Sequence, residues 1–500
     1  MNTSGLDKPE RHIKSLRELI AVLEEIGDVH QVDVEVDWKH QMCAIIRRAY
    51  ELPTAAPLFT QITGIEPGFR VLGAPGGLSP DPAHPMARIA LAIGLPADSS
   101  PTEIVRAWSQ LPGKEPIPPR EVPTGLCKQN VLTGNDVDLL RLPAPYIHPN
   151  DGGRYLNTFG TVVATAPDGS WTNWSITRIA VSDKTTMTGI VGPSQHIGQI
   201  HKMWRELGQD MPFALSLGAE PAVAMVGGFP ARAGVSEAEL LGGWFGEPLE
   251  VVRCETNDLL VPASSEIVIE GVLSFHETTP EGPMGEYSGY RWPADKRNCP
   301  VYKVSAITFR DDPILPVVAA GMPAEENHTV WGTGIAAGAL YELRERGLPV
   351  TDCFVPFAAA VHWLVVAVDT SAGPGAAGSW MALAREIGET AFRTRPAALV
   401  PKIIVVGDDI DPSDLKQVVW TMAVNADPEE TIFVPDQPTI PLVGYLTPEE
   451  RRHARSTKAI YNCLPRDDWT PQTKPMRAEF ATYPADVRET VLTNWPEYGL

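Results

Sequence analysis

Cysteine is scarce in this sequence, and long hydrophobic runs are missing. The six cysteines are far apart, so there is no CxxC pair of the kind that binds zinc or exchanges disulfides. Thiols spread this thinly over 500 residues are typical of the reduced interior of a cell. The longest apolar stretch, residues 357–368, is shorter than the roughly 20 residues that cross a bilayer. The first residues contain no apolar signal-peptide core, so we expect a cytoplasmic protein with no membrane partner.

Positive charge is also in deficit. Lys and Arg total 41 against 62 Asp and Glu, which gives a formal net charge of −21. Nucleic acids and anionic membranes bind positive surfaces, so neither is expected as the main partner. Proline, in contrast, is abundant, with 48 of 500 residues. Because a proline inside a helix costs about 3 kcal/mol, the chain cannot consist mainly of long helices.

The sequence divides into three regions of different pattern. Helical periodicity over residues 16–26 and 41–51 is followed by a connector rich in proline and glycine. Short runs of Val, Ile, Thr and Phe at 161–166, 266–275 and 301–310 then predict strands. Helical and strand patterns alternate after about residue 327, at 335–346, 380–394, 402–406 and 414–423. The predicted fold class is α+β, with domains at 1–125, 126–325 and 326–500.

The common nucleotide-binding and hydrolase motifs are absent. There is no GxxxxGK[ST], no GxSxG and no HExxH. The glycines of 332–338 do not have the spacing of a GxGxxG dinucleotide motif, and they fit the start of a closely packed helix better.

Two glutamates, Glu281 and Glu286, flank a short segment that contains Pro283. The proline and its neighbouring glycines exclude a helix, so the chain must turn and can bring both carboxylates to one cavity. Two carboxylates held close together, or one in an apolar pocket, acquire a raised pKa that suits proton transfer. The alternative is a pair of solvated loop glutamates, and spacing alone favours that alternative.

Polar and apolar residues alternate in the segment from Asn173 to Arg178. In a strand, alternation would place Asn173, Ser175 and Thr177 on one face and Trp174, Ile176 and Arg178 on the other. An arginine among apolar side chains can receive a carboxylate or phosphate through its planar fork. An edge strand with one exposed arginine is an equally good interpretation.

The histidines give only a weak metal signal. His196 and His201 are five residues apart, not four as in a two-histidine metal face. Asn, His and Glu together would suit a hard divalent ion that also carries a phosphate, but spacing does not show that such groups meet. The residues alone therefore indicate an α+β enzyme with a candidate site of carboxylates and arginine.

Three motifs make the sequence recognisable: TNWSITR at 172–178, SQHIGQIHKMW at 194–204 and EGPMGEYSGY at 281–290. With these motifs it resembles the UbiD-type decarboxylases, in the branch of ferulic (cinnamic) acid decarboxylase and of pyrrole- and indole-carboxylate decarboxylases. The similarity covers nearly the whole chain and includes HPNDGGRY at 148–155 and ENHTVWG at 326–332.

The resemblance implies a fold and a set of cofactors. The fold is a flavin-binding domain with a split β-barrel, a connecting helix and a C-terminal α/β domain that forms a homodimer. The cofactors are prenylated FMN, supplied by a flavin prenyltransferase, with Mn²⁺ and K⁺. Matching positions for the divalent metal are Asn173, His196 and Glu237, and for potassium Trp174, Val226, Gly227, Phe229 and Glu237. The cofactor positions are Asn173, Trp174, Ser175, Ile176, Thr177, Arg178, Gln195, His196, Gly228, Phe229, Pro230, Glu237 and Arg395.

The resemblance also assigns catalytic roles. Arg178 matches the arginine that orients the substrate carboxylate, and Glu281 and Glu286 match the two glutamates of the acid/base triad. Glu286 is placed as the proton donor. A wholly different reading is an inactive flavin-binding partner, but such a protein would not need the complete triad.

Three departures from the family pattern bear on cofactor and substrate. Arg395, or Arg393 in another register, replaces a flavin-contacting lysine. The segment 227–230 lacks the hydroxyl groups of the family's Ser-Ser-Met-Pro, which weakens the potassium assignment. Gly192 replaces a bulky aliphatic residue, which is expected to widen the substrate pocket.

The wider pocket bears on the choice of substrate. Together with polar groups from the candidate pocket residues Tyr287, Asn327 and His328, it favours an indole-3-carboxylate-like small aromatic acid. Pyrrole-2-carboxylate and cinnamate-type acrylates are the alternatives. The C-terminal tail at 487–500 resembles a helix that could exchange across the dimer.

Overall fold

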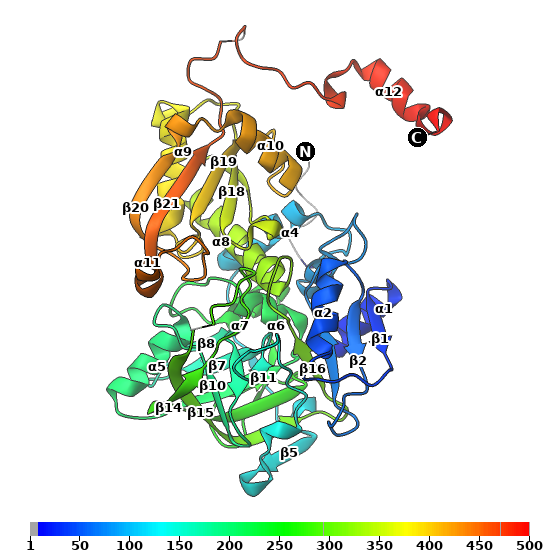
Figure 1. The fold of residues 1–500 in the computed structure, drawn as a ribbon, viewed down its shortest axis with the longest axis vertical. Coiled ribbons are helices and arrows are strands. Elements are labelled where there is room, and N and C mark those ends of the chain that lie inside the picture. The colour runs from blue at the N-terminus through cyan, green and yellow to red at the C-terminus, as the bar shows by residue number, and fades with distance from the viewer. Residues whose placement is uncertain (1–8, 294, 471, 500) are drawn as a thin grey trace.

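The computed structural model describes residues 9–293, 295–470 and 472–499. Figure 1 shows an N-terminal α/β layer, a large curved sheet below and beside it, and a C-terminal α/β unit above. Helices and strands are mixed in the first and last regions, while the central region contains runs of consecutive strands, which agrees with the predicted α+β class. None of the helices in these ranges is long and apolar enough to span a bilayer.

The N-terminal layer is a four-stranded sheet covered by helices. Both helices predicted here are confirmed, as α1 (Leu16–Glu25) and α2 (Met42–Glu51). The connector contains ordered elements rather than a linker, including α3 (Ala87–Ala92) and α4 (Pro101–Trp108). The sheet order is β1 (Val29–Val32), β2 (Ala56–Phe59), β3 (Arg70–Gly73) and β16 (Ile314–Val317). Since β16 comes from much later in the sequence, this layer is joined to the central region through its sheet.

The central region is a nine-stranded, mostly antiparallel sheet. The strands predicted at 161–166, 266–275 and 301–310 are confirmed, and the last two extend further than expected. The path is β6 (Arg154–Asn157), β9 (Ile179–Val181), β10 (Thr186–Gly189), β15 (Arg297–Phe309), β14 (Ile267–Glu281), β11 (Met211–Leu217), β7 (Thr161–Thr165) and β8 (Thr172–Ser175), with β5 (Asn130–Thr133) paired to β15.

The order of these strands requires the sheet to curl into a barrel that is open on one side. β8 ends one side of the path, while β9, the next strand in the sequence, lies near the other end. Six strand spacings of about 4.8 Å would separate them by about 29 Å in a flat sheet. Yet only residues 176–178 connect them, a span of at most about 15 Å between Cα atoms. This short segment therefore crosses the opening of a split barrel.

Three helices and a small sheet flank the barrel. The helices are α5 (His196–Glu206), α6 (Pro221–Gly227) and α7 (Glu237–Phe245), and the small sheet contains β4 (Arg120–Glu121), β12 (Glu250–Arg253) and β13 (Leu260–Pro262).

The C-terminal unit is a five-stranded sheet flanked by helices. The sheet order is β17 (Val350–Phe354), β18 (Trp363–Val368), β19 (Lys402–Gly407), β21 (Arg455–Asn462) and β20 (Ile432–Pro438). The predicted helices are confirmed as α8 (Gly332–Glu345), α9 (Trp380–Arg393) and α10 (Leu415–Asn425), and α11 is Pro448–His453. The tail ends in α12 (Ala485–Thr493), which Figure 1 shows far from the body.

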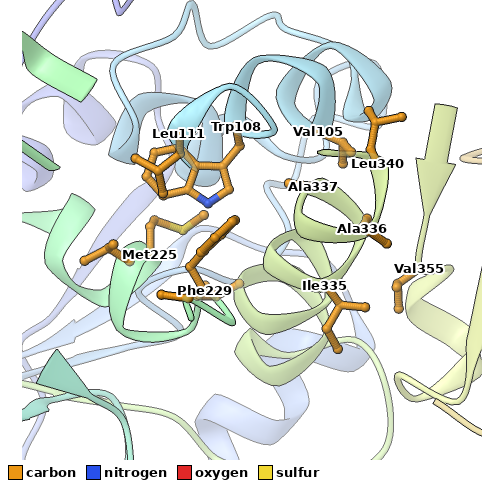
Figure 2. Close-up of a cluster of buried hydrophobic side chains, with 14 of the residues drawn as sticks. Val105, Trp108, Leu111, Met225, Phe229, Ile335, Ala336, Ala337, Leu340 and Val355 are labelled. Carbon is orange, nitrogen blue, oxygen red and sulfur yellow. The ribbon is translucent and has the colours of Figure 1, made fainter. Parts of the chain in front are cut away.

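A hydrophobic core joins these regions around α8 (Figure 2). Trp108 from α4 meets Phe229, which follows α6, with ring centroids 6.2 Å apart. The glycines of α8 allow close packing, as predicted. A Cβ on Gly334 would lie 3.0 Å from the Gly228 carbonyl oxygen. The division at 1–125, 126–325 and 326–500 stays our proposal, although the core crosses both boundaries.

Candidate active site at the barrel opening

Arg178 lies in the segment that crosses the barrel opening, and it is held by the two predicted glutamates. Its Nε and Nη2 donate to Glu281 at 2.9 and 3.0 Å, which is a bidentate pair. Its Nη1 donates to Glu286. The side chains of Glu281 and Glu286 are only 1% and 13% exposed, so the solvated-loop alternative is excluded.

The strand prediction for this segment was only partly right. β8 ends at Ser175, so side chains do not alternate as far as Arg178. Thr177 is buried and donates to the Ile190 carbonyl at 2.6 Å. Because the backbone leaves the ladder here, Arg178 turns toward Glu281 and is not an exposed edge residue.

The loop between the glutamates is fitted closely against residues 148–155. The Pro283 carbonyl accepts from the Gly152 N–H at 2.8 Å, and a Cβ at Gly152 would lie 2.1 Å from the Gly282 carbonyl. Gly282 has φ +82°, a conformation that glycine adopts without strain. The turn predicted from Pro283 is therefore present, and it depends on glycine at both contact points.

Burial and neighbouring charges shift the pKa values of Glu286 and Arg178. It raises the pKa of the Glu286 carboxyl above the usual range, and the charge of Arg178 opposes part of that rise. Burial alone would lower the pKa of Arg178, but the charges of Glu286 and Glu281 raise it, so the guanidinium stays charged. A fixed cation beside a carboxyl with a raised pKa can both hold an anion and deliver a proton.

Two residues of this site were not identified from the sequence. Tyr155 donates to Glu281 at 2.8 Å, and Asp151 accepts from the Gly285 N–H at 3.1 Å and from the His148 N–H at 2.7 Å. Both belong to the HPNDGGRY motif, whose only signal was the resemblance itself.

The residues expected to bind a divalent metal come together at β8. Asn173 donates to Glu237 at 2.8 Å and lies 3.3 Å from His196 Nδ1. The second Glu237 oxygen accepts from the Trp174 N–H at 2.8 Å. His196 and Glu237 are the first residues of α5 and α7, so two helix N-termini, which favour anions, point to this cluster.

The donors of this cluster fit a metal and a phosphate. Asn173 Oδ1, Ser175 Oγ and His196 Nε2 are buried, and none has a hydrogen-bond partner in the described part of the chain. Buried polar atoms are normally paired, so three orphans beside a carboxylate indicate a missing ligand. No cluster of three His, Cys, Asp or Glu occurs within the described ranges, because one of the donors here is an asparagine amide.

The segment 227–230, which was expected to contact potassium and the cofactor, lies close to residue 176. A Cβ on Gly227 would be 3.3 Å from the Ile176 side chain, and the Val226 carbonyl accepts from Phe229 N at 3.0 Å. Arg395 is within electrostatic reach of Glu237, while Arg393 turns to its own helix and bonds Thr390 at 3.3 Å.

At the expected pocket, Gln195 lies over Gly192. The Gln195 amide oxygen accepts from Gly192 N at 2.7 Å, and a Cβ on Gly192 would lie 3.1 Å from that oxygen. Part of the space freed by the glycine is therefore taken by a flexible side chain.

The remaining pocket candidates, His328 and Asn327, differ in whether they keep a hydrogen-bonding atom without a protein partner. His328 accepts from Glu325 N at 3.0 Å and donates to the Tyr287 carbonyl at 2.9 Å, so backbone groups engage both ring nitrogens. Burial lowers the pKa of His328 to about 4, which keeps the ring neutral. Asn327 donates its amide to Glu325 at 3.0 Å, which directs Oδ1 the other way. Asn327, rather than His328, retains an acceptor for a ring N–H.

Comparison with known proteins agrees with this geometry. Residues 20–108, 120–323 and 328–463 match the N-terminal, Rift-related and C-terminal domains of 3-octaprenyl-4-hydroxybenzoate carboxy-lyase, the UbiD domains. The chain is 42% identical to a pyrrole-2-carboxylic acid decarboxylase of Pseudomonas aeruginosa, over 100% of this chain and 99% of the relative. It is 36% identical to ferulic acid decarboxylase 1 of Saccharomyces cerevisiae, over 97% and 98%.

Solved structures share the fold. A vanillic acid decarboxylase of Sedimentibacter hydroxybenzoicus, in its closed form, superposes with a TM-score of 0.83 at 24% identity, over 97% of this chain and 99% of that one. The UbiD-class enzyme HmfF of Pelotomaculum thermopropionicum, in complex with FMN, has a TM-score of 0.78 at 25% identity, over 93% and 97%. Full-length identity to named decarboxylases, together with matches to all three domains, shows that the chain belongs to the UbiD family of decarboxylases.

Proposed function

We propose that the protein decarboxylates a heteroaromatic carboxylic acid at Arg178, with Glu286 as the proton donor. The observation that carries the proposal is the buried triad at the barrel opening. Loss of CO₂ consumes one proton for each turnover, so a buried carboxyl with a raised pKa next to an anion receptor has the required chemistry. An inactive flavin-binding partner would have no use for this buried triad, since removing an ion from water costs several kcal/mol.

Arg178 is proposed to hold the substrate carboxylate. Glu281 engages Nε and Nη2, which fixes the guanidinium plane and leaves Nη1 toward Glu286. Tyr155 in turn donates to Glu281 and fixes that carboxylate. A substrate carboxylate that binds at the Nη1 side lies beside Glu286, which then protonates the ring carbon that CO₂ leaves.

Replacing Glu286 by Gln tests the proton donor. Gln has nearly the same shape but no acidic proton, so kcat for CO₂ release is expected to fall by about 10²- to 10⁴-fold while flavin absorbance of the purified protein stays unchanged. Glu277→Gln, on the exposed part of β14, is the matched control and is expected to keep full activity. Normal turnover by the Glu286 variant would remove Glu286 from the mechanism.

The donor cluster is proposed to hold prenylated FMN through its phosphate and a divalent ion, Mn²⁺. When bound, this cofactor supplies the electron sink for the carbanion character left by CO₂. Asn173, His196 and Glu237 would ligate the metal, and residues 173–178, 228–230, Gln195 and Arg395 would surround the cofactor. K⁺ would bind carbonyls of Trp174, Val226, Gly227 and Phe229 with Glu237. A flavin prenyltransferase is the proposed supplier of the cofactor.

Glu237→Gln is expected to lose the divalent ion. The amide removes the negative charge that touches Asn173, so Mn²⁺ measured by plasma mass spectrometry should fall at least about tenfold per protein. Glu239→Gln, two residues further along α7, is the control. Equal Mn²⁺ in both variants would contradict the ligand assignment, whatever their activities.

The proposed substrate class is a heteroaromatic acid with a ring N–H, of which indole-3-carboxylate is our first choice and pyrrole-2-carboxylate the second. Asn327 Oδ1 supports an N–H ligand, and Gly192 supports a wide pocket. The relative from P. aeruginosa that is named for pyrrole-2-carboxylate supports the same class. Cinnamate-type acrylates, represented by the yeast relative, have no N–H to offer.

Gly192→Val tests whether the pocket prefers indole-3-carboxylate or pyrrole-2-carboxylate. Added methyl groups displace Gln195 and narrow the pocket, so kcat/KM for indole-3-carboxylate should fall at least about tenfold, a loss typical of a misfitting pocket. Pyrrole-2-carboxylate should change less than about threefold. CO₂ release by wild type and variant from indole, pyrrole, furan and cinnamic acids is the measurement. If wild type releases CO₂ from none of these acids, the proposed function fails.

We also propose a homodimer that uses the C-terminal tail. No residue of α12 is buried in the single chain, and Val487 and Leu492 are exposed. On α10, Val419, Trp420 and Val424 are also exposed. Support comes from an evolved HmfF form that is described as dimeric.

Light scattering should give twice 54.3 kDa for the full chain, and a smaller or unstable dimer after truncation before residue 480. A monomeric mass for the full chain would exclude this.

A further inference from the structure

The loop that carries Glu286 has no regular structure of its own. We call residues 286–293 and 295 the acid loop. A turn closes its first part, in which Gly289 N donates to the Glu286 carbonyl at 2.9 Å and Glu286 N to the Tyr290 carbonyl at 2.9 Å. A second turn joins Asp295 N to the Trp292 carbonyl at 2.9 Å. No helix or strand includes a residue of the acid loop.

The acid loop covers the triad directly. A Cβ on Gly282, between the two glutamates, would lie 2.5 Å from the Asp295 carbonyl. The charge of Asp295 also acts on Glu286. A displacement of the second turn therefore moves the backbone that lies on the acid/base segment.

Outside the triad, the attachments of this loop to the barrel region are exposed or partly exposed. Asp295 pairs with Arg297 of β15 at 3.3 Å, and the Arg297 side chain is 45% exposed. Arg291 donates to the Asn150 carbonyl at 2.9 Å, and a Cβ on Gly289 would touch the Met322 sulfur at 2.7 Å. Arg291 is partly exposed and Met322 is 63% exposed, so neither contact is a buried anchor.

A residue of the C-terminal unit supplies stronger contacts. Arg451, on α11, donates to Asp295 at 2.8 Å, and its guanidinium carbon lies 4.2 Å above the Trp292 ring. Its Nε donates to the Pro441 carbonyl at 2.8 Å, which holds the side chain against its own unit. The side chains of Arg451 and Asp295 are 20% and 18% exposed, so this pair is far less solvated than an ordinary surface ion pair.

The same unit meets the acid loop at two more places. A Cβ on Gly444 would lie 3.2 Å from the Tyr290 ring, and the His362 ring stacks near the Tyr287 ring at a centroid distance of 6.3 Å. The C-terminal unit thus packs along the acid loop, and among the described residues of that unit Arg451 makes the ion pair with it.

We propose that Arg451 is a positioning residue for the decarboxylation, which holds the acid loop, and with it Glu286, through Asp295 and Trp292. The proposal rests on the proposed role of Glu286 as the proton donor. A proton donor must stay in register with the reacting carbon, and a displacement of about 1 Å can cost about 10²-fold in rate. The C-terminal unit therefore contributes to catalysis although it supplies none of the triad.

Arg451→Met tests this, because methionine keeps an unbranched stem over Trp292 but cannot pair with Asp295. We expect kcat for CO₂ release to fall at least about tenfold, while KM and bound flavin stay within about twofold. Asp295→Asn should lower kcat at least as much, because Asp295 also pairs with Arg297 at 3.3 Å. The double variant should then be no worse than Asp295→Asn alone, since the contact with Arg451 is already lost. Arg451→Lys, which retains the charge but not the fork, should lie in between.

Arg455→Met is the matched control. Arg455 is four residues away, and it pairs with Asp436 of its own unit in an exposed position, with side chains 45% and 78% exposed. Its activity should stay within twofold of wild type. If Arg455→Met loses as much activity as Arg451→Met, or if losses in the double variant add, Arg451 acts only through general stability and the proposal is wrong.

Hydrogen exchange of the holoenzyme gives a readout that does not need turnover. Amides of residues 286–293 should exchange at least about tenfold faster in Arg451→Met, while amides of β14 and the melting temperature stay near wild type. Unchanged exchange in the acid loop would overturn the proposal. This measurement also separates two failures, because faster exchange in a protein that releases no CO₂ would sink the proposed function and keep the positioning role.

Discussion

The site depends on one buried cation between two buried carboxylates. Arg178, Glu281 and Glu286 are largely removed from water, and each of these charged groups would destabilise the fold if it were buried without a partner. The arginine compensates Glu281 through two hydrogen bonds, whereas Glu286 receives one and keeps a raised pKa. This asymmetry divides the carboxylates into a support for Arg178 and an acid. Any side chain without two parallel donors at position 178 would leave Glu281 with Tyr155 but without its bidentate partner, so lysine is no substitute.

The curl of the sheet brings the two halves of the site together. β8 contributes Asn173 to the donor cluster, and only a few residues later the chain crosses the opening with Arg178. A fully closed barrel would have paired this segment in a ladder and turned its side chains alternately in and out. Because the barrel is split, the backbone at 176–178 leaves the ladder, and the donor cluster and the triad lie at two ends of one short segment.

The features of the fold and site that could be predicted from the sequence are those determined by neighbouring residues in the chain. The turn at 281–286 follows from Pro283 and its glycines, and most helices follow from apolar periodicity. The prediction that Arg178 continues the strand alternation was wrong. Where a strand ends is decided by its pairing partner, and here the pairing of β7 with β8 ends at Ser175 although the alternating pattern continues. Tyr155 and Asp151 were missed because their roles arise from contacts more than 100 residues away. The proposed metal ligands came from family resemblance, since 64 residues separate Asn173 from Glu237.

A net charge of −21 would repel the anions that this site must bind, so local positive charge has to outweigh it. Arg178 at the triad, Arg395 near Glu237 and the N-termini of α5 and α7 provide that charge within one region. Such a region works only if it is stiff, because flexible charges would neutralise one another. Part of the proline excess serves this purpose: Pro283 shapes the acid/base turn, and Pro230 and Pro396 both pack on Gly338 of α8. That packing connects the cofactor segment to the C-terminal unit, which also holds the acid loop through Arg451. Segment 227–230 and the acid loop are therefore braced by the same unit, so we infer that the placement of this unit controls the distance between them.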